Sequence, residues 1–145
     1  MASSYFAYGI NMDRDHFKKL CPDAVSIAPA VLEDHRFFVN RAGWATVVPA
    51  GGKLVHGVLW RVDSSCLEKI DRFEGVDEDL YRRTRMTVSC LAGEMPAEVY
   101  VATDPRPGRP RSAYIDSIVR AATLEGFPRD YLQGLDRWAK ETGES

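Results

Sequence analysis

Residues 5–12 read Tyr-Phe-Ala-Tyr-Gly-Ile-Asn-Met, and the rest of the chain is organised around this stretch. The residues up to Tyr8 predict a short strand, which breaks at Gly9 and leads into a helix over residues 12–20. Glycine permits the positive φ of a sharp turn and lets a ligand approach the backbone closely. Successive N–H groups in such a turn can converge on one point and bind an anion. Taken alone, the octet is also typical of an ordinary strand-to-helix turn.

Residues 67–76 form a second informative stretch, Leu-Glu-Lys-Ile-Asp-Arg-Phe-Glu-Gly-Val. Ser65 and the Glu three residues later have capping-box spacing at the start of this predicted helix, and Gly75 ends it. Leu67, Ile70 and Glu74 share one helical face, so a carboxylate continues an apolar stripe. Burial beside Phe73 would raise the pKa of that carboxyl, because its charged form loses hydration. The alternative is a solvated glutamate at a frayed helix end.

Most of the remaining segments read as strands, and two helices come last. Turn signals at residues 41–43 and 49–52 separate several of the strand segments. The closing helices are a segment capped by Ser112 that runs to Glu125, and a segment opened by Pro128. Strands followed by helices indicate an α+β fold, here in a single domain of residues 1–145. The predicted strand segments span residues 26–33, 35–40, 45–49, 53–62, 81–91 and 97–102.

Composition excludes several classes of protein. The chain has 145 residues, of which 45% are hydrophobic and 28% charged, with a net charge of −2. So weak a field does not attract nucleic acid or an anionic membrane. No apolar run reaches the length of a membrane-spanning helix, and the first residues lack a basic leader. We therefore expect a soluble cytoplasmic protein that binds neither nucleic acid nor membrane, and its oligomeric state stays open.

The cysteines and histidines do not form a recognisable site. Cys21, Cys66 and Cys90 are scattered, odd in number and without C-x-x-C spacing, which argues against a disulfide framework and against zinc. We expect them to be reduced thiols of a cytosolic protein. The three histidines fall on different predicted elements, so no metal site is expected; they are His16, His35 and His56.

Together, the two stretches resemble the γ-glutamylcyclotransferase family, which is also called AIG2-like. The family pattern is similar to Y-F-A-Y-G-S-N-L, followed further along by L-D-x-x-E-G-V-x-x-x-x-Y-x-x. The resemblance covers most of the chain and includes the His-Gly-Val-Leu-Trp segment at residues 56–60. It also includes the tyrosine-containing strand at residues 97–100 and the closing helix entered at residues 126–131. This chain departs from the pattern at Ile10, where the family usually has Ser, and at Met12, where it usually has Leu.

The resemblance implies a small mixed β-barrel flanked by helices, with the site at one mouth. It also implies an enzyme that needs neither metal nor organic cofactor. In the implied acyl-transfer reaction, the α-amine of a small γ-glutamyl substrate attacks its own γ-carbonyl. The products are 5-oxoproline and a free amine or amino acid.

Residue roles carried over from the resemblance centre on Glu74 as the catalytic proton shuttle. The backbone N–H groups of the first stretch would hold the α-carboxylate or the carbonyl oxygen. The phenol hydroxyls of Tyr81 and Tyr100 would donate hydrogen bonds to the glutamyl group, although strand packing explains these residues as well. The loop candidates for substrate binding are Tyr8, Gly9, Ile10, Asn11 and Met12.

Three other functions stay open. One is a small-molecule binding domain without turnover, which the Ile10 departure permits and the unusual position of Glu74 disfavours. Another is a cyclotransferase specific for γ-glutamylamines or for carrier-bound γ-glutamyl groups. The third is a related acyl- or amide-bond enzyme. Residues 103–112 carry three prolines and three arginines and predict a surface loop, and whether this loop closes over the site is open.

Overall fold

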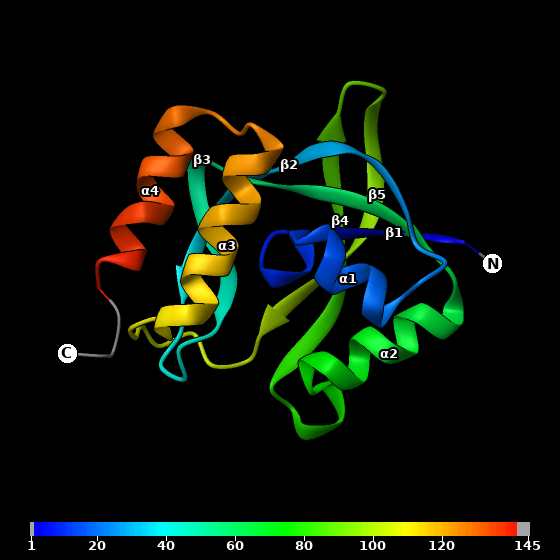
Figure 1. Ribbon diagram of the computed structural model, residues 1–145, viewed down its shortest axis with the longest axis horizontal. Helices are drawn as coiled ribbons and strands as arrows, with labels where there is room; N and C mark the ends of the chain where they lie inside the picture. The colour runs from blue at the N-terminus through cyan, green and yellow to red at the C-terminus, as the bar shows by residue number, and fades with distance from the viewer. Residues whose placement is uncertain (1, 142–145) are drawn as a thin grey trace.

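The computed structural model describes residues 2–141 as a five-stranded barrel flanked by four α-helices (Figure 1). In chain order the elements are β1 (Ser3–Ala7), the 3-10 turn η1 (Ile10–Met12), α1 (Arg14–Leu20), β2 (Val25–Val39), β3 (Ala45–Val62), α2 (Ser64–Glu74), the 3-10 turn η2 (Val76–Glu78), β4 (Tyr81–Cys90), β5 (Gly93–Ala102), α3 (Ser112–Glu125) and α4 (Arg129–Ala139).

The strands close in the order β1-β3-β2-β4-β5. All pairings are antiparallel except the last, in which β1 runs parallel to β5 with Tyr5 opposite Glu98. The prediction of a mixed β-barrel with flanking helices is confirmed. Of the helices, α3 and α4 lie side by side at one end of the view, and α2 lies at the other (Figure 1).

The longest strands, β2 and β3, are each continuous, whereas the sequence predicted two separate segments in each. Their pairing shifts register between Glu33 and His35. At this bulge Asp34 adopts a φ of 59°, and its carboxylate accepts a hydrogen bond from the Gly52 N–H at 2.9 Å. Aspartate tolerates this left-handed conformation and satisfies a facing donor, so the ladder bends instead of ending. The prediction of a turn at residues 49–52 is therefore wrong, because β3 continues through these residues.

The β1–β3 seam depends on Gly57. A Cβ at this position would lie 2.5 Å from the Ala7 carbonyl oxygen and 2.7 Å from the Phe6 ring. The absence of a side chain lets Phe6, which is fully buried, pack directly over the β3 backbone. Around this seam the core is completed by other fully or almost fully buried side chains, among them Phe17, Leu59, Trp60, Ile70, Ile115, Ile118 and Leu135.

Helix starts differ from the sequence prediction in their caps. Asp13 caps α1 by accepting from the His16 N–H. Asp63, rather than Ser65, caps α2 by accepting from the Cys66 N–H at 2.8 Å. A residue outside the helix is the better acceptor for first-turn donors, and Ser65 is already helical.

The two C-terminal helices begin without a side-chain cap. Ser112, predicted as the cap of α3, is its first helical residue and follows Arg111. Pro128 precedes the first turn of α4 and is not part of it. The predicted end of α3 is confirmed, since the helix stops at Gly126 with a φ of 74°.

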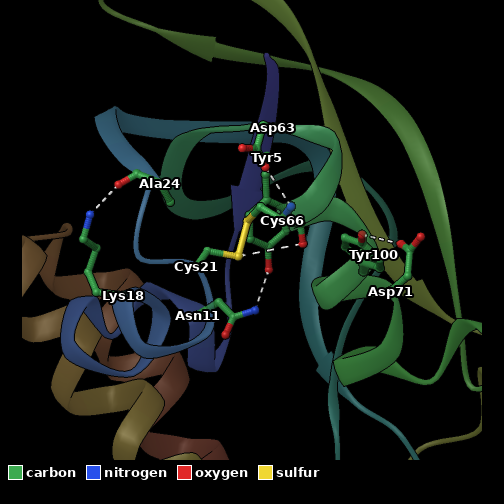
Figure 2. Close-up of a disulfide and its surroundings, with 9 residues drawn as sticks. All are labelled: Tyr5, Asn11, Lys18, Cys21, Ala24, Asp63, Cys66, Asp71 and Tyr100. Carbon is green, nitrogen blue, oxygen red and sulfur yellow. Dashed lines mark hydrogen bonds between the residues drawn. A yellow bond between two sulfur atoms is a disulfide. The ribbon is translucent and has the colours of Figure 1, made fainter. Parts of the chain in front are cut away.

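Cys21 and Cys66 form a disulfide, which corrects the expectation of three reduced thiols. Cys21 ends α1, and Cys66 lies in the first turn of α2, so the bond joins the end of one helix to the start of the other (Figure 2). Their Cα atoms are 5.6 Å apart although 45 residues separate them in the chain. The sequence argument missed the pair because spacing along the chain does not reveal proximity in the fold. Cys90 is free.

None of the helices within residues 2–141 has the length and hydropathy needed to cross a membrane.

Opening the disulfide should destabilise the fold. Cross-linking two cysteines 45 residues apart restricts the unfolded chain, by about 4 kcal/mol in the chain-entropy model. We expect the double variant Cys21→Ala/Cys66→Ala to lose about 2–4 kcal/mol in the free energy of unfolding, measured by urea titration. Reducing agent should lower the stability of the wild type by a similar amount and leave the double variant unchanged. Cys90→Ala is the matched control, and a double variant as stable as the wild type would contradict the expectation.

Candidate active site

A small cavity gathers the residues that the sequence singled out. Its volume is about 20 Å³, which is room for a single water molecule. Each predicted site residue lines it except Met12, which is buried in the core. The lining residues come from β1, the following loop, α2, the barrel strands and α3: they are Tyr5, Phe6, Tyr8, Gly9, Ile10, Asn11, Ala45, Glu74, Tyr81, Tyr100 and Tyr114.

Glu74 is the last residue of α2, and its position follows from the apolar stripe of that helix. Leu67 and Ile70 are buried in the core on the same face, so the carboxylate is drawn toward the barrel. Gly75 then adopts a φ of 74° and reverses the chain. Phe73, which the sequence placed beside the carboxylate, points away, is 46% exposed and stacks on His16.

Burial raises the pKa of the Glu74 carboxyl from an ordinary 4.5 to about 7. Among the described residues this side chain takes part in no salt bridge, so nothing offsets its lost hydration. Burial also raises the pKa of every tyrosine that lines the cavity, so the phenols stay neutral. Glu74 is therefore the one lining group that titrates near neutral pH.

Gly9 leads from β1 into the 3-10 turn with a φ of −118°. The positive φ expected at this glycine is not observed. A Cβ there would meet the Tyr114 hydroxyl and the Ala45 side chain at 3.8 Å, which are ordinary contacts with two lining residues. The absent side chain therefore leaves open space in the cavity, and the N–H groups at the start of the turn that follows lack intrahelical partners.

Asn11 holds a buried amide at the cavity wall. Its exposed fraction is 2%, and its Nδ2 donates to the Tyr5 hydroxyl at 2.9 Å (Figure 2). Its Oδ1 accepts no hydrogen bond from any of the described residues. A buried acceptor without a donor is costly, so this oxygen is available to a bound ligand.

The phenol hydroxyls of the predicted site residues donate to protein groups. Tyr81 donates to the Ala45 carbonyl, and Tyr8 donates to the Tyr100 carbonyl. Tyr100 donates to the Asp71 carboxylate at 2.6 Å (Figure 2). Each of these oxygens keeps lone pairs that can accept, so toward a ligand they are acceptors rather than the donors that we expected.

Two residues that sequence reasoning did not assign to the site support it. Asp71 holds the Tyr100 hydroxyl and pairs with Arg83 at 3.4 Å. Tyr114 reaches the cavity from α3 and accepts from the Ala45 N–H at 3.0 Å. Asp71 lies three residues before Glu74, one helical turn away, which was a readable signal. Tyr114 carried no signal in the sequence.

The arginine- and proline-rich loop lies beside the β2–β3 turn and not over the cavity. Gly108 packs against the backbone of Asn40, which bridges to Pro107. The Arg111 guanidinium lies 4.3 Å from the centre of the Trp44 ring, and Trp44 packs edge-on against Tyr114. No residue of 103–112 lines the cavity.

Comparisons with known proteins agree on one family. The profile described as Gamma-glutamyl cyclotransferase, AIG2-like, matches residues 5–117. Gamma-glutamylcyclotransferase from Bos taurus is 32% identical over 143 residues, covering 91% of this chain and 76% of the relative. The Homo sapiens protein of the same name is 30% identical over 142 residues, covering 90% and 76%.

Solved structures agree with this result. One named Gamma-glutamyl cyclotransferase matches with a TM-score of 0.85 and 27% identity, over 94% of this chain and 87% of that chain. An AIG2-like protein from Mus musculus shares the fold, with a TM-score of 0.60 and 22% identity over 70% of this chain and 78% of that one.

The raised pKa of Glu74 predicts a pH-dependent loss of stability. The folded state holds this proton up to about pH 7, whereas the unfolded chain releases it near pH 4.5. The stabilisation is therefore complete below pH 4.5 and is lost as the pH rises to 7. Glu74→Gln removes this dependence, so its stability relative to wild type should increase over that window by up to about 3 kcal/mol. Urea titrations from pH 4.5 to 8 measure the difference, which should stay flat for Glu68→Gln on the exposed face of α2.

Proposed function

The chain belongs to the Gamma-glutamyl cyclotransferase, AIG2-like family, and from this premise we propose which of its residues perform the reaction. It is an enzyme, a cyclotransferase that acts on γ-glutamyl compounds. The observation that carries the residue assignment is the desolvated carboxylate of Glu74, with a pKa of about 7, in a cavity whose other polar side chains stay neutral.

The substrate supplies its own nucleophile. The α-amine attacks the γ-carbonyl, a carbon–nitrogen bond closes the five-membered ring, and the γ-amide bond then breaks. Because the amine is tethered to the carbonyl, much of the entropy cost of bringing them together is already met. The protein must fold the glutamyl chain, stabilise the oxyanion and help to move protons. The α-ammonium loses two protons as it becomes the ring N–H, and the leaving nitrogen gains two as it becomes an ammonium.

Glu74 is the proton carrier in this proposal. With a pKa of about 7, the carboxylate and the carboxylic acid are both well populated near neutral pH. The carboxylate accepts a proton from the α-ammonium, which frees the amine to attack, and the resulting acid donates a proton to the leaving nitrogen. A solvated glutamate would accept less readily, because its conjugate acid is too strong.

The loop after β1 binds the glutamyl end. The backbone N–H groups from Tyr8 to Asn11 lie at the start of the 3-10 turn and suit the α-carboxylate or the developing oxyanion. The unpartnered Oδ1 of Asn11 suits a donor such as the α-ammonium. Tyr81 and Tyr100 contribute acceptor oxygens and shape. Ile10 keeps its backbone N–H, so replacing the family's usual serine alters recognition rather than chemistry.

The leaving group and the cellular location are finer parts of the proposal. Amino acids, amines and carrier-bound groups are all possible leaving groups in this reaction, and a panel of substrates distinguishes them.

We retain the cytoplasm as the location of the protein. The disulfide is the observation against it, since disulfides are rare where thiols are kept reduced. Its cysteines are only 2% and 6% exposed, which limits access by reductant.

Glu74→Gln should fold and lose turnover by at least about a hundredfold, the lower range for a general acid–base residue. Mass spectrometry would follow 5-oxoproline from a panel of γ-glutamyl dipeptides and γ-glutamylamines. Glu68→Gln, on the same helix but exposed, is the matched control. Near-wild-type turnover in Glu74→Gln would disprove the assignment. A folded wild type that is inactive on every panel member would instead favour the non-catalytic binding domain or a carrier-bound substrate.

Asn11→Ala should raise KM with a smaller effect on kcat. A hydrogen bond to a charged group contributes about 1.5–3 kcal/mol, so KM should rise by about ten- to a hundredfold. Tyr5→Phe removes the partner of Nδ2 but keeps Oδ1, and should change KM less. Steady-state kinetics on the best panel substrate measures both variants. An unchanged KM in Asn11→Ala would contradict the loop role.

A further inference from the structure

A second and much larger cavity lies between α4 and the β2–β3 hairpin. Its volume is about 640 Å³, against about 20 Å³ for the cavity at Glu74, and no residue lines both. This volume falls within the range of small-molecule sites in proteins. The cyclotransferase reaction uses none of its residues, so the cavity calls for an explanation of its own.

Unpaired cations surround this cavity. Arg36, Lys53 and Arg137 line it, and none of them takes part in a salt bridge with another described residue. The carboxylates on the same wall are Asp130 and Glu141, and Asp130 already accepts from a backbone N–H at the start of α4. Cations outnumber carboxylates, so the local field favours an anion.

Aromatic rings form the walls between these charges. The His56 and Tyr131 rings lie 4.7 Å apart, and both line the cavity. Trp138 also lines it and is held edge-on by Phe38 with ring centres 5.9 Å apart. The Arg36 guanidinium lies over the same Phe38 ring at 4.9 Å, which keeps a positive charge beside the aromatic wall. A flat ring that carries an acidic group matches this combination.

Gly134 keeps the cavity open from the interior of α4. Glycine is a poor helix former, and this one lacks the positive φ that would require it. A Cβ there would meet nothing closer than the Arg137 guanidinium, at 3.9 Å. Neither backbone nor packing therefore accounts for a glycine at this position. Its effect is to leave room on the helix face that lines the cavity.

We propose that the cavity between α4 and the β2–β3 hairpin is a second ligand site, which binds a small aromatic anion. The carboxylate, sulfonate or phosphate of the ligand lies among Arg36, Lys53 and Arg137. Its ring packs against Trp138 and Tyr131, over the space that Gly134 leaves free.

The aromatic sulfonate 8-anilinonaphthalene-1-sulfonate is a suitable probe. Titration followed by probe fluorescence and by calorimetry should show one saturable site per chain, weakened by added salt. Gly134→Leu fills the cavity, and Arg137→Glu reverses one of its charges, so each should raise Kd at least tenfold. The matched controls lie on the same helix outside the cavity: Gln133→Leu and Arg129→Glu should stay within twofold of wild type. Glu74→Gln should bind the probe like wild type.

Two measurements separate loss of the site from loss of the fold. Gly134→Leu should still release 5-oxoproline at the wild-type rate, because no residue is shared between the two cavities. Gly134→Ala should raise Tm, because alanine favours the helix, and should weaken probe binding less than Gly134→Leu does. The proposal is overturned if the probe shows no saturable binding. It is also overturned if Gly134→Leu and Gln133→Leu bind the probe equally.

Discussion

Closure of the barrel by β1 is the constraint on which the rest of the structure depends. This strand of five residues is hydrogen-bonded to β3 on one side and to β5 on the other. The β3 partner lacks a side chain at Gly57, and a Cβ there would overlap the Ala7 carbonyl. Since β1 is fixed in this way, the chain that leaves it at Tyr8 and Gly9 is delivered beside the end of α2. The loop after β1 and the Glu74 carboxylate therefore meet because the pairing of β1 fixes its position in the barrel.

The environment of Glu74 shows how an acid can be tuned without an opposing charge. The polar side chains beside it in the cavity are mainly phenols, whose own pKa values are raised by burial and which remain neutral. Neutral hydroxyls bound to backbone carbonyls provide shape and polarity but do not stabilise the carboxylate. Desolvation therefore sets the pKa of Glu74. The fold causes this desolvation because the apolar face of α2 draws the carboxylate out of water.

Local patterns in the sequence were enough to predict the helix of Glu74, its end at Gly75 and the strand-to-loop origin of Asn11. These features depend on residues within a turn or two of one another. Features that depend on distant residues were missed. The Cys21–Cys66 bond, the reach of Tyr114 into the cavity and the position of Asn11 against Tyr5 all require the closed barrel. The continuity of β2 and β3 was missed because glycine and proline signals mark bulges as well as turns.

The Cys21–Cys66 bond also gives the chain a mechanical property. It closes a covalent ring that contains all of β2 and β3, the two strands with the most extensive pairing in the barrel. When a force pulls the two termini apart, the load passes through the Cys21–Cys66 disulfide and not through the backbone between the two cysteines. The chain between the cysteines, with a sequence separation of 45 and roughly 160 Å long when extended, carries no load while the bond is intact. Stretching the oxidised protein would unravel its helices and outer strands, while the central hairpin bears no tension.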